Sequence, residues 1–490
     1  MFGAPATRQS TLGTDTLFPV TSDCASILRL PLDQLPDPLP ITPIARRAGQ
    51  SPVALTLRPP GSKSLTNRAL LLAALAEGTS TIRHALVGAD DAERMLEAVE
   101  QLGARVQRVD RSTLRISGVG GSWRVYPDGV ALFLNNAGTA TRFLAAAALL
   151  ATGPITIDGN ERMRQRPLGE LVSALRTLGA RVEELGKPGC PPVRITPPPD
   201  SQPSVATLKF GPTQSSQFIS GLLMAASCLP DGLTIDLGPE PTSASYIGMT
   251  VRLLDQVGVR VRTSEQMRLI RVLPGLSAFD LDVEPDASGA TYFWAAAALL
   301  PGAAVRVTGL DAHSMQGDAG FPEQLGRMGA GVRRSEDEEN PWVECRGPDS
   351  LAPTLTDMGS MPDATMTLAV CCAFASGTSI LRGVRTLRVK ECDRIDALQT
   401  ELGKLGVTIE CNVNADSDVM TITPPSEGGR IGVASKPGAA RVEFDTYDDH
   451  RMAMSLALVG LRRPNVWIRN PRCVEKTYPD FWRDLACLYS

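Results

Sequence analysis

Several features that mark a specialised class of protein are scarce in this sequence. Aromatic residues make up 5% of its 490 residues, three residues are histidine, and the net charge of −4 comes without any basic tract. This balance is ordinary for a soluble protein and gives no reason to expect nucleic acid as a partner. The longest apolar runs, near residues 143–151 and 366–375, are too short and too alanine-rich to span a bilayer, so no membrane partner is expected.

The cysteines and the first segment of the chain indicate the compartment. The ten cysteines form no CxxC pair and have neither zinc-ligand spacing nor the density of a disulfide framework. Reduced, mostly buried thiols favour a cytoplasmic location. Residues 1–45 contain four aspartates and many prolines, without the basic start and apolar centre of a signal peptide. We interpret them as a flexible or loosely docked extension.

What the chain does have is a repeat. A phrase of apolar helix, turn and strand occurs six times at spacings of 74, 75, 74, 74 and 86, and its helices open at Arg68, Arg142, Gln217, Thr291, Thr365 and Arg451. Between successive copies lies an amphipathic helix, such as 91–102, that ends near a glycine and leads into a strand. Short links between alternating strands and helices predict a mixed α/β (α+β) fold. The longer fifth interval predicts a surface loop around Pro425–Ala440.

The ends of the repeat array predict the domain organisation. The sixth copy ends in its amphipathic helix, Tyr478–Leu488, whereas the early strand Val53–Leu57 has no partner of its own, so we expect this strand to dock into the C-terminal half. The resulting parts are a flexible N-terminal extension (1–45), a discontinuous C-terminal domain (46–60 plus 285–490) and an inserted N-terminal domain (61–284). A solenoid is the alternative, but helices that are apolar almost all round favour two similar closed domains of three repeats each.

Polar residues directly precede the apolar helices and suggest one large site for anions, because helix N-termini attract negative charge. The first three copies supply Lys63, Ser64, Asn67, Arg68, Asn136, Gly138, Thr139, Ser215, Ser216 and Gln217. Gly138 would let a ligand approach the backbone, although an ordinary turn glycine and ordinary helix caps explain these residues equally well. Arg162, Arg164 and Arg166 belong either to the same anion site or to a solvated face.

The later copies add groups suited to proton transfer. Asp286 and Asp363 fall at matching places of two repeats, where each can cap a helix. Asp363 can also accept a proton. Glu391 lies in a seven-residue segment with three cations, which could tune it as a general acid or base. His450 has no HxH or HxxxH partner, so no metal site is predicted. Lys476, taken alone, is compatible with a solvated lysine.

Eight segments in this order resemble the 5-enolpyruvylshikimate-3-phosphate synthase family: PGSKSLTNR, NNAGTATR, RMRQRP, SSQF, PDA, RVKECDR, YDDHRMAM and KTYPDFW. The resemblance extends from about residue 50 to the C-terminus. It implies two domains of three βαβαββ units, with the active site in the cleft between them. The implied reaction is transfer of the enolpyruvyl group of phosphoenolpyruvate to the 5-hydroxyl of shikimate 3-phosphate by addition and elimination of phosphate. This step of aromatic amino-acid biosynthesis uses no metal or organic cofactor.

The resemblance also implies roles for individual residues. The implied contacts of shikimate 3-phosphate are Lys63, Ser64, Arg68, Ser215, Ser216, Gln217, Ser243, Tyr246, Asp363, Thr386 and Lys390. The implied contacts of phosphoenolpyruvate are Lys63, Asn136, Gly138, Arg166, Gln217, Arg394, Arg451 and Lys476. Lys63, Asp363, Glu391 and His450 would be catalytic, with Asp363 accepting the proton of the hydroxyl and Glu391 protonating the methylene carbon.

Two other functions remain possible at this stage. The related UDP-N-acetylglucosamine enolpyruvyl transferase would be expected to have a lysine–asparagine pair in place of Lys63-Ser64, and a reactive cysteine where residues 135–170 have none. An inactive anion-binding scaffold would have no need of Lys63, Asp363 and Glu391 together. Thr386 and Phe143 depart from the residues most common in the family, and the unsubstituted Gly138 implies inhibition by glyphosate. We expect a monomer that acts on small molecules.

Overall fold

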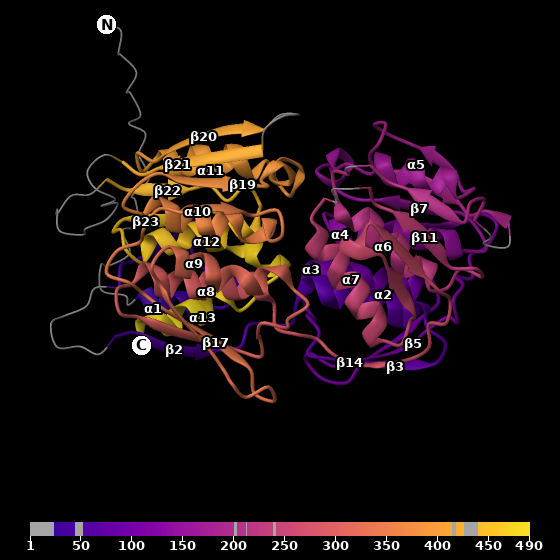
Figure 1. Ribbon diagram of the computed structural model, residues 1–490, viewed down its shortest axis with the longest axis horizontal. Helices are drawn as coiled ribbons and strands as arrows, with labels where there is room; N and C mark the ends of the chain where they lie inside the picture. Colours follow the sequence, from indigo (N-terminus) through magenta and orange to yellow (C-terminus); the bar gives the residue numbers. More distant parts are fainter. Residues whose placement is uncertain are drawn as a thin grey trace, which may run out of the picture.

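The computed structural model of the protein describes residues 24–44, 52–199, 203–211, 213–238, 242–413, 418–425 and 440–490. These residues form two lobes that lie side by side (Figure 1). The first lobe surrounds an apolar core drawn from residues 65–283, and the second surrounds a core that combines residues 24–41 with residues 287–488. The mixed α/β class predicted from the sequence is confirmed, and the repeats form two separate cores, unlike a solenoid.

The sheets of the first lobe share one pattern: a parallel edge strand, a central strand and two antiparallel strands. Their orders are β14–β3–β5–β4, β6–β7–β9–β8 and β10–β11–β13–β12. The bounds are β3 (Thr79–Arg83), β4 (Arg105–Arg108), β5 (Leu114–Ser117), β6 (Val130–Phe133), β7 (Ile155–Asp158), β8 (Arg181–Glu184), β9 (Val193–Thr196), β10 (Thr207–Lys209), β11 (Leu233–Asp236), β12 (Val261–Thr263), β13 (Leu269–Val272) and β14 (Asp280–Asp282).

The second lobe repeats this pattern twice in full and once with a substitute strand. Its sheets have the orders β2–β15–β17–β16, β18–β19–β21–β20 and β1–β23–β22. The bounds are β1 (Leu39–Ile41), β2 (Ala54–Leu57), β15 (Ala304–Thr308), β16 (Gly331–Arg334), β17 (Trp342–Arg346), β18 (Leu355–Asp357), β19 (Ser379–Arg382), β20 (Thr408–Val413), β21 (Asp418–Thr423), β22 (Val442–Phe444) and β23 (Val466–Ile468). Apart from its two end residues, the predicted loop around Pro425–Ala440 lies outside the described residues.

The six apolar helices pack at the centres of the lobes. They are α2 (Lys63–Leu75), α4 (Gly138–Ala147) and α6 (Ser216–Ala226) in the first lobe, and α8 (Ala287–Leu299), α10 (Thr365–Ala373) and α12 (His450–Gly460) in the second. All 13 residues of α8 are buried, as expected for a helix that is apolar all round. Within the described residues, no helix has the length and apolar character needed to cross a bilayer.

The amphipathic helices lie further from the lobe centres. They are α3 (Asp90–Gln101), α5 (Gly169–Thr177), α7 (Ala244–Gln256), α9 (Phe321–Arg327), α11 (Arg394–Gly403) and α13 (Phe481–Ala486). Gly103 and Gly179, which follow α3 and α5, have φ of 102° and 94°. These left-handed conformations confirm the predicted glycine caps.

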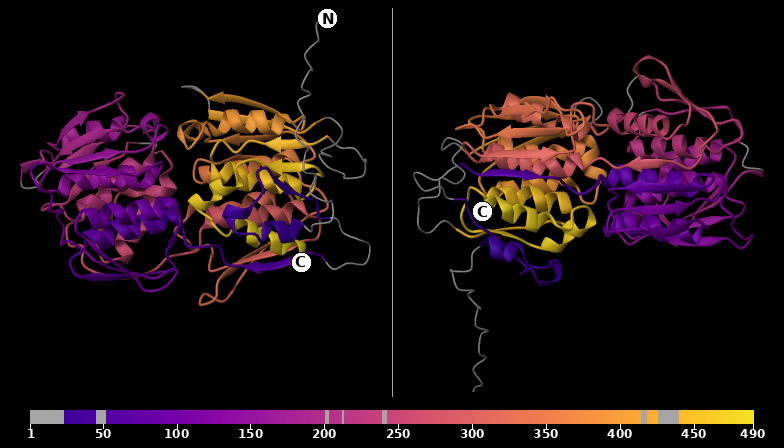
Figure 2. Two further views of the ribbon diagram at one scale, coloured as in Figure 1. Left: turned by 180° about the vertical axis from the view of Figure 1, so that it is seen from behind. Right: turned by 90° about the horizontal axis from the view of Figure 1, so that it is seen from below.

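The two lobes exchange strands where the chain passes between them. As predicted, β2 pairs in parallel with β15 of the second lobe. In return, β14 pairs in parallel with β3 of the first lobe. The two crossing segments are tied together, because Ser62 N–H donates to the carbonyl of Glu284 at 2.8 Å and Asp286 N–H donates to that of Pro60 at 2.8 Å. The lobes are therefore joined by a paired crossing at one end (Figure 2).

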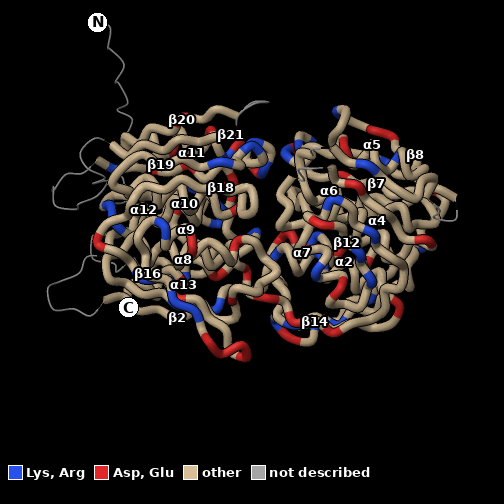
Figure 3. The backbone as a smooth tube through the Cα atoms, viewed as in Figure 1, with Lys and Arg blue, Asp and Glu red and all other residues tan. Residues whose placement is uncertain are grey.

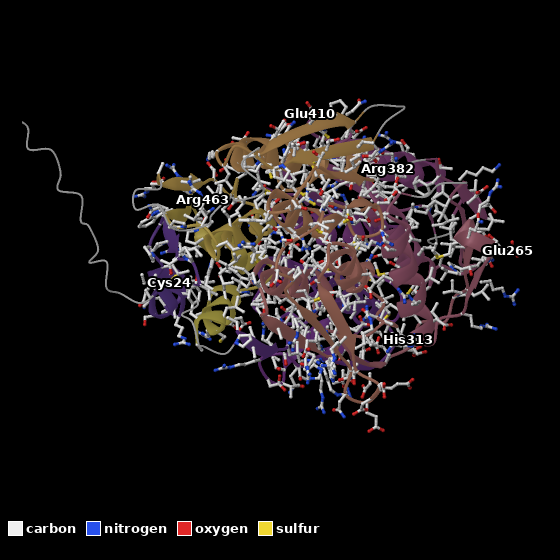
Figure 4. All side chains as sticks on the ribbon, turned by 60° about the vertical axis from the view of Figure 1, so that its left-hand side comes forward. Cys24, Glu265, His313, Arg382, Glu410 and Arg463 are labelled. Carbon is white, nitrogen blue, oxygen red and sulfur yellow. The ribbon has the colours of Figure 1, made fainter. Side chains whose placement is uncertain are left out.

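The segment before residue 45 is folded over residues 24–41, in contrast to the flexible extension expected from the sequence. It forms α1 (Cys24–Leu28), a 3-10 turn at Leu32–Gln34 and strand β1. β1 lies antiparallel to β23, with Leu39 opposite Ile468, at the position where the other copies place their own antiparallel strand. Cys24 marks α1 beside the C-terminal part of the chain in Figure 4, and α1 packs against α13. Burial of Leu28, Leu39 and Ile41 explains why a proline-rich stretch becomes ordered here.

Candidate active site

Two adjoining cavities lie between the lobes, and residues from both lobes line each of them. The first, here called the hydroxyl cavity, is lined by Lys63, Ser64, Thr139, Arg142, Arg166, Pro167, Gln214, Ser215, Ser216, Gln217, Ser243, Tyr246, Asp363, Thr386, Val389 and Lys390. The second, the ionic cavity, is lined by Lys63, Asp91, Gly138, Thr139, Arg166, Gln217, Asp363, Lys390, Glu391, Arg394 and Arg451. Figure 3 shows basic and acidic positions on the facing sides of both lobes. Most residues predicted for the site are thus brought together.

Helix N-termini point their polar ends at this region. Ser62 caps α2 by accepting from the N–H of Leu65, and Ser215 caps α6 by accepting from the N–H of Gln217. The cap alternative considered for Ser215 is therefore correct, and the same residue also lines the hydroxyl cavity. Helix N-termini make the region favourable for anions in addition to the side-chain charges.

Lys63 is buried and its ammonium has a carboxylate partner that the sequence did not reveal. Its Nζ lies 3.2 Å from Oδ2 of Asp91, while Nζ of Lys476 lies 3.8 Å from Oδ1 of the same carboxylate. Asp91 is 1% exposed. It therefore links a lysine of the first lobe to one of the second. In the sequence, Asp91 resembles the ordinary acidic first turn of an amphipathic helix.

Gly138 begins α4 against two buried guanidinium groups. A Cβ atom at this position would lie 2.5 Å from Nη2 of Arg166 and 2.6 Å from Nη1 of Arg142. Nη1 of Arg166 donates to the carbonyl of Asn136 at 3.1 Å, and Nη1 of Arg142 donates to Oε1 of Gln217 at 3.0 Å. Burial and the nearby charge of Arg166 lower the pKa of Arg142 to about 9. The lack of a side chain at Gly138 therefore leaves room for these two guanidinium groups.

The three arginines of the cluster at 162–166 point in different directions. Arg166 is buried and lines both cavities. Arg164 forms a bidentate pair with Asp158 of its own lobe, at 2.8 and 2.6 Å. Arg162 crosses to the second lobe, where Nε donates to the carbonyl of Glu391 at 2.8 Å and Nη2 donates to that of Lys390 at 2.7 Å. The solvated-face alternative therefore describes Arg164 alone.

Asp363 and Asp286 differ although they occupy matching places in the repeat. Asp286 caps α8, accepting from the N–H groups of Ser288 and Gly289, and lines neither cavity. Asp363 lines both: its Oδ2 lies 2.8 Å from Nη2 of Arg451, and its Oδ1 lies 3.4 Å from Nζ of Lys390. Burial alone would raise the pKa of Asp363, but the surrounding cations outweigh it and hold that pKa well below its usual value.

Glu391 has a similar environment in the ionic cavity. Its Oε2 lies 3.0 Å from Nη2 of Arg394, and its Oε1 lies 3.3 Å from Nζ of Lys476. Burial would raise the pKa of Glu391, yet Lys476, Arg394, Arg166 and Lys63 together lower it well below the usual range. Without a bound anion, both candidate acid–base residues are therefore ionised.

Arg394 is held in place by a second residue that the sequence analysis did not select. Its Nε donates to Oδ2 of Asp449 at 2.7 Å and its Nη2 donates to Oδ1 at 3.2 Å, while Asp449 also caps α12. Asp449 has no exposed surface, so this pair is shielded from solvent. A carboxylate that both caps one helix and orients an arginine of another cannot be identified from local sequence.

Some predicted residues lie outside the lining of both cavities. Arg68 is buried behind them and its guanidinium donates to Thr250, Ser220 and the carbonyls of Ser64 and Tyr246, so its donors are used within the protein. Asn136 and Lys476 line a neighbouring opening, and Nζ of Lys476 donates to the carbonyl of Asn136 at 3.0 Å.

Three predicted site residues have buried polar atoms without a hydrogen-bond partner among the described residues. These atoms are both ring nitrogens of His450, the hydroxyl oxygen of Thr386 and Nε of Arg166. Burial and the charge of Arg451 lower the pKa of His450 well below its usual value, so its ring is neutral near pH 7. Thr386 lines the hydroxyl cavity, whereas His450 has no exposed surface and lines neither cavity.

Comparison with known proteins connects this geometry to a family. The chain matches the family described as EPSP synthase (3-phosphoshikimate 1-carboxyvinyltransferase) over residues 48–485. A 3-phosphoshikimate 1-carboxyvinyltransferase from Laribacter hongkongensis is 44% identical over 438 residues, which cover 88% of this chain and 96% of that protein. The chain belongs to the EPSP synthase family.

Further relatives agree with this membership. A protein of the same name from Burkholderia ambifaria is 42% identical over 443 residues, covering 88% of this chain and 96% of its own length. The solved structure of EPSP synthase from Acinetobacter baumannii is similar with a TM-score of 0.69 and 26% identity, covering 90% of this chain and 96% of that one. The predicted EPSP synthase family, and with it the predicted enzyme class, is confirmed.

Proposed function

We propose that this chain transfers the enolpyruvyl group of phosphoenolpyruvate to the 5-hydroxyl of shikimate 3-phosphate, releasing phosphate. The observation that carries the proposal is the placement of Asp363 at the junction of the two cavities, because a base there faces both reactants. Six residues line both cavities: Lys63, Thr139, Arg166, Gln217, Asp363 and Lys390. Two substrates bound side by side would therefore share one reacting zone.

The hydroxyl cavity suits shikimate 3-phosphate. Its hydroxyl groups from Ser64, Ser215, Ser216, Ser243 and Thr386 can bind the phosphate and the ring hydroxyls of the substrate. Lys63 and Lys390 supply charge, and Gln217 and Tyr246 lie on the same wall. Arg68 acts from behind by holding α6 and α7 against α2, so we assign it a positioning role.

The ionic cavity suits phosphoenolpyruvate. Arg166, Arg394 and Arg451 can form bidentate hydrogen bonds to its phosphate and carboxylate, and Gly138 leaves space beside Arg166. Lys476 and Asn136 close the outer side through their mutual hydrogen bond. His450, neutral and unpartnered, can donate one hydrogen bond to the bound anion.

Proton transfer follows from the charges on the two carboxylates. Asp363 is ionised and can accept the proton of the 5-hydroxyl as the oxygen attacks the enolpyruvyl carbon. Glu391 must be protonated to donate to the methylene carbon. Binding of phosphoenolpyruvate places negative charge among the cations that lower the pKa of Glu391, which raises that pKa. Elimination of phosphate then reverses both roles: Glu391 removes a proton from the methyl group formed by the addition, and Asp363 donates its proton to the departing phosphate.

The two-domain division predicted from the sequence (46–60 plus 285–490, with 61–284 inserted) fits this proposal, because each half contributes groups that the other lacks. We further propose that the chain acts as a cytoplasmic monomer and that glyphosate competes with phosphoenolpyruvate. Gel filtration with light scattering tests the monomer, and inhibition kinetics at varied phosphoenolpyruvate test the competition.

The experiment that tests the function is phosphate release with the purified chain. We expect release only when shikimate 3-phosphate and phosphoenolpyruvate are both present. Turnover with UDP-N-acetylglucosamine in place of shikimate 3-phosphate would instead support the related transferase. Absence of turnover with either acceptor, in a chain that binds both ligands, would identify an inactive scaffold.

A further inference from the structure

The folded N-terminal segment (residues 24–44) contacts the part of the second lobe that carries phosphoenolpyruvate residues. The 3-10 turn at Leu32–Gln34 packs against the 3-10 segment Pro471–Lys476, which ends at Lys476. Arg472 donates to the carbonyl of Asp33, and the N–H of Asn470 donates to Oδ1 of Asp37 at 2.9 Å.

Asn470 forms hydrogen bonds with both the N-terminal segment and the segment before α12. It has left-handed backbone angles (φ 44°, ψ 57°) and directly precedes Pro471–Lys476. Its side-chain Nδ2 donates to Oδ1 of Asp448 at 3.0 Å. Asp448 also has a positive φ, of 54°, and lies directly before the residue that caps α12, the helix that carries Arg451. Asn470 therefore connects the segment that ends at Lys476 with the segment that precedes Arg451, and Asp37 accepts a hydrogen bond from the backbone of Asn470.

The second lobe is shaped to receive the N-terminal segment. β1 occupies the antiparallel position that the sixth copy cannot fill itself. α12 ends at Gly460, where a Cβ atom would lie 2.5 Å from the Cβ of Ile41. A separate hydrogen bond, from the hydroxyl of Tyr489 to the carbonyl of Thr42 at 2.6 Å, attaches the segment far from Asn470. Such a fitted surface indicates one fixed docking position.

We propose that the N-terminal segment is an internal brace for the phosphoenolpyruvate half of the site, with Asp37 and Asn470 as positioning residues for Arg451 and Lys476. The inference rests on the proposed function, because it assumes that these two cations bind phosphoenolpyruvate. Asp37 and Asn470 line neither cavity, and the residues that they are proposed to position are implied contacts of phosphoenolpyruvate. The effect of losing the brace is therefore specific to one of the two substrates.

The test uses point variants of the full chain. Asp37→Ala removes the acceptor, and Asn470→Gly removes the side-chain link to Asp448 while keeping a residue that tolerates left-handed angles. Each change removes about one hydrogen bond, so we expect the KM for phosphoenolpyruvate to rise about fivefold, with the KM for shikimate 3-phosphate unchanged. Asp37→Asn retains an acceptor oxygen and should restore the normal KM. Tyr489→Phe is the matched control, because it loses a bond of the same segment elsewhere.

The possible results distinguish a positioning role of the N-terminal segment from a general effect on stability, and they distinguish failure of this proposal from failure of the proposed function. If Asp37→Ala and Asn470→Gly change the KM for phosphoenolpyruvate no more than Tyr489→Phe does, the brace is rejected. A parallel rise of both KM values with a lower melting temperature also rejects it, since a general loss of stability would explain that result. Absence of turnover in the unmodified chain would reject the proposed function, on which the brace depends.

Discussion

Replacement of Arg162 by alanine tests whether contact between the two lobes is needed for turnover. Arg162 belongs to the first lobe and donates to the carbonyls of Lys390 and Glu391 in the second, at 2.7 and 2.8 Å. It touches neither cavity, so its loss removes no group that faces a substrate. Two hydrogen bonds from a charged donor that is partly exposed stabilise the closed arrangement by about 1–2 kcal/mol. This corresponds to a factor of about 5–30 in the population of the closed state.

The assay is steady-state phosphate release with both substrates varied. For Arg162→Ala we expect kcat/KM to fall by about 5–30-fold, in line with the loss of closed molecules. Arg164→Ala is the matched control, because Arg164 lies two residues away and pairs with Asp158 inside its own lobe. Small-angle scattering with both ligands should show a more expanded particle for Arg162→Ala than for Arg164→Ala. If kcat/KM of the two variants agrees within about twofold, the closure argument is refuted.

Three further predictions concern the site and its surroundings. Gly138→Ala should raise the KM for phosphoenolpyruvate about tenfold in steady-state kinetics, because a Cβ 2.5 Å from Nη2 of Arg166 must displace that guanidinium; an unchanged KM would exclude a role of Arg166 in binding. Asp363→Asn should lower kcat by about 10²–10⁴-fold with a normal melting temperature, since the proton acceptor is lost; a kcat near that of the unmodified chain would exclude Asp363 as the base. Burial raises the pKa of Asp318 to about 7 from 3.8, so the stability that its protonated form provides is present below pH 3.8 and lost as the pH rises through about 7. Melting curves from pH 4 to 8 should show this loss in the unmodified chain and not in Asp318→Asn, and parallel curves would contradict the shift.

Much of the fold was predictable because its signals are local. Each apolar helix of the repeat, like the glycine after α3, can be read from a short stretch of sequence. The docking of strand Val53–Leu57 into the second lobe was predicted because this strand has no partner of its own and the sixth copy of the repeat ends without a strand after its last helix. The use of β1 as the substitute for a missing strand was not predicted, because pairing of a three-residue strand depends on which sheet edge is free.

The site was predictable where its residues stand at helix starts and not where they act through a distant partner. Lys63 and Asp363 precede or begin apolar helices, so their positions alone indicated a shared site. Asp91 and Asp449 were not selected as site residues because each is defined by a contact across lobes or between helices, with Lys476 and with Arg394. Arg162 was considered for the anion site, but its hydrogen bond to the carbonyl of Glu391 in the second lobe was not predicted. Sequence distance hides such pairs, and ordinary helix caps or solvated charges explain each residue equally well.

The charges of the site connect binding to proton transfer. In the structure, Asp363 and Glu391 form ion pairs with cations that we propose as substrate contacts: Arg451, Lys390, Arg394 and Lys476. A phosphate or carboxylate that takes over those cations weakens the attraction that keeps the two carboxylates ionised, so the proton affinity of each carboxylate rises as the substrates bind. Lys63 and Arg166 of the first lobe add to the second-lobe cations that lower the pKa of Glu391, so we expect full exchange of partners to require both lobes. We therefore propose that acid–base competence depends on closure of the lobes with both substrates present, which would protect phosphoenolpyruvate from water.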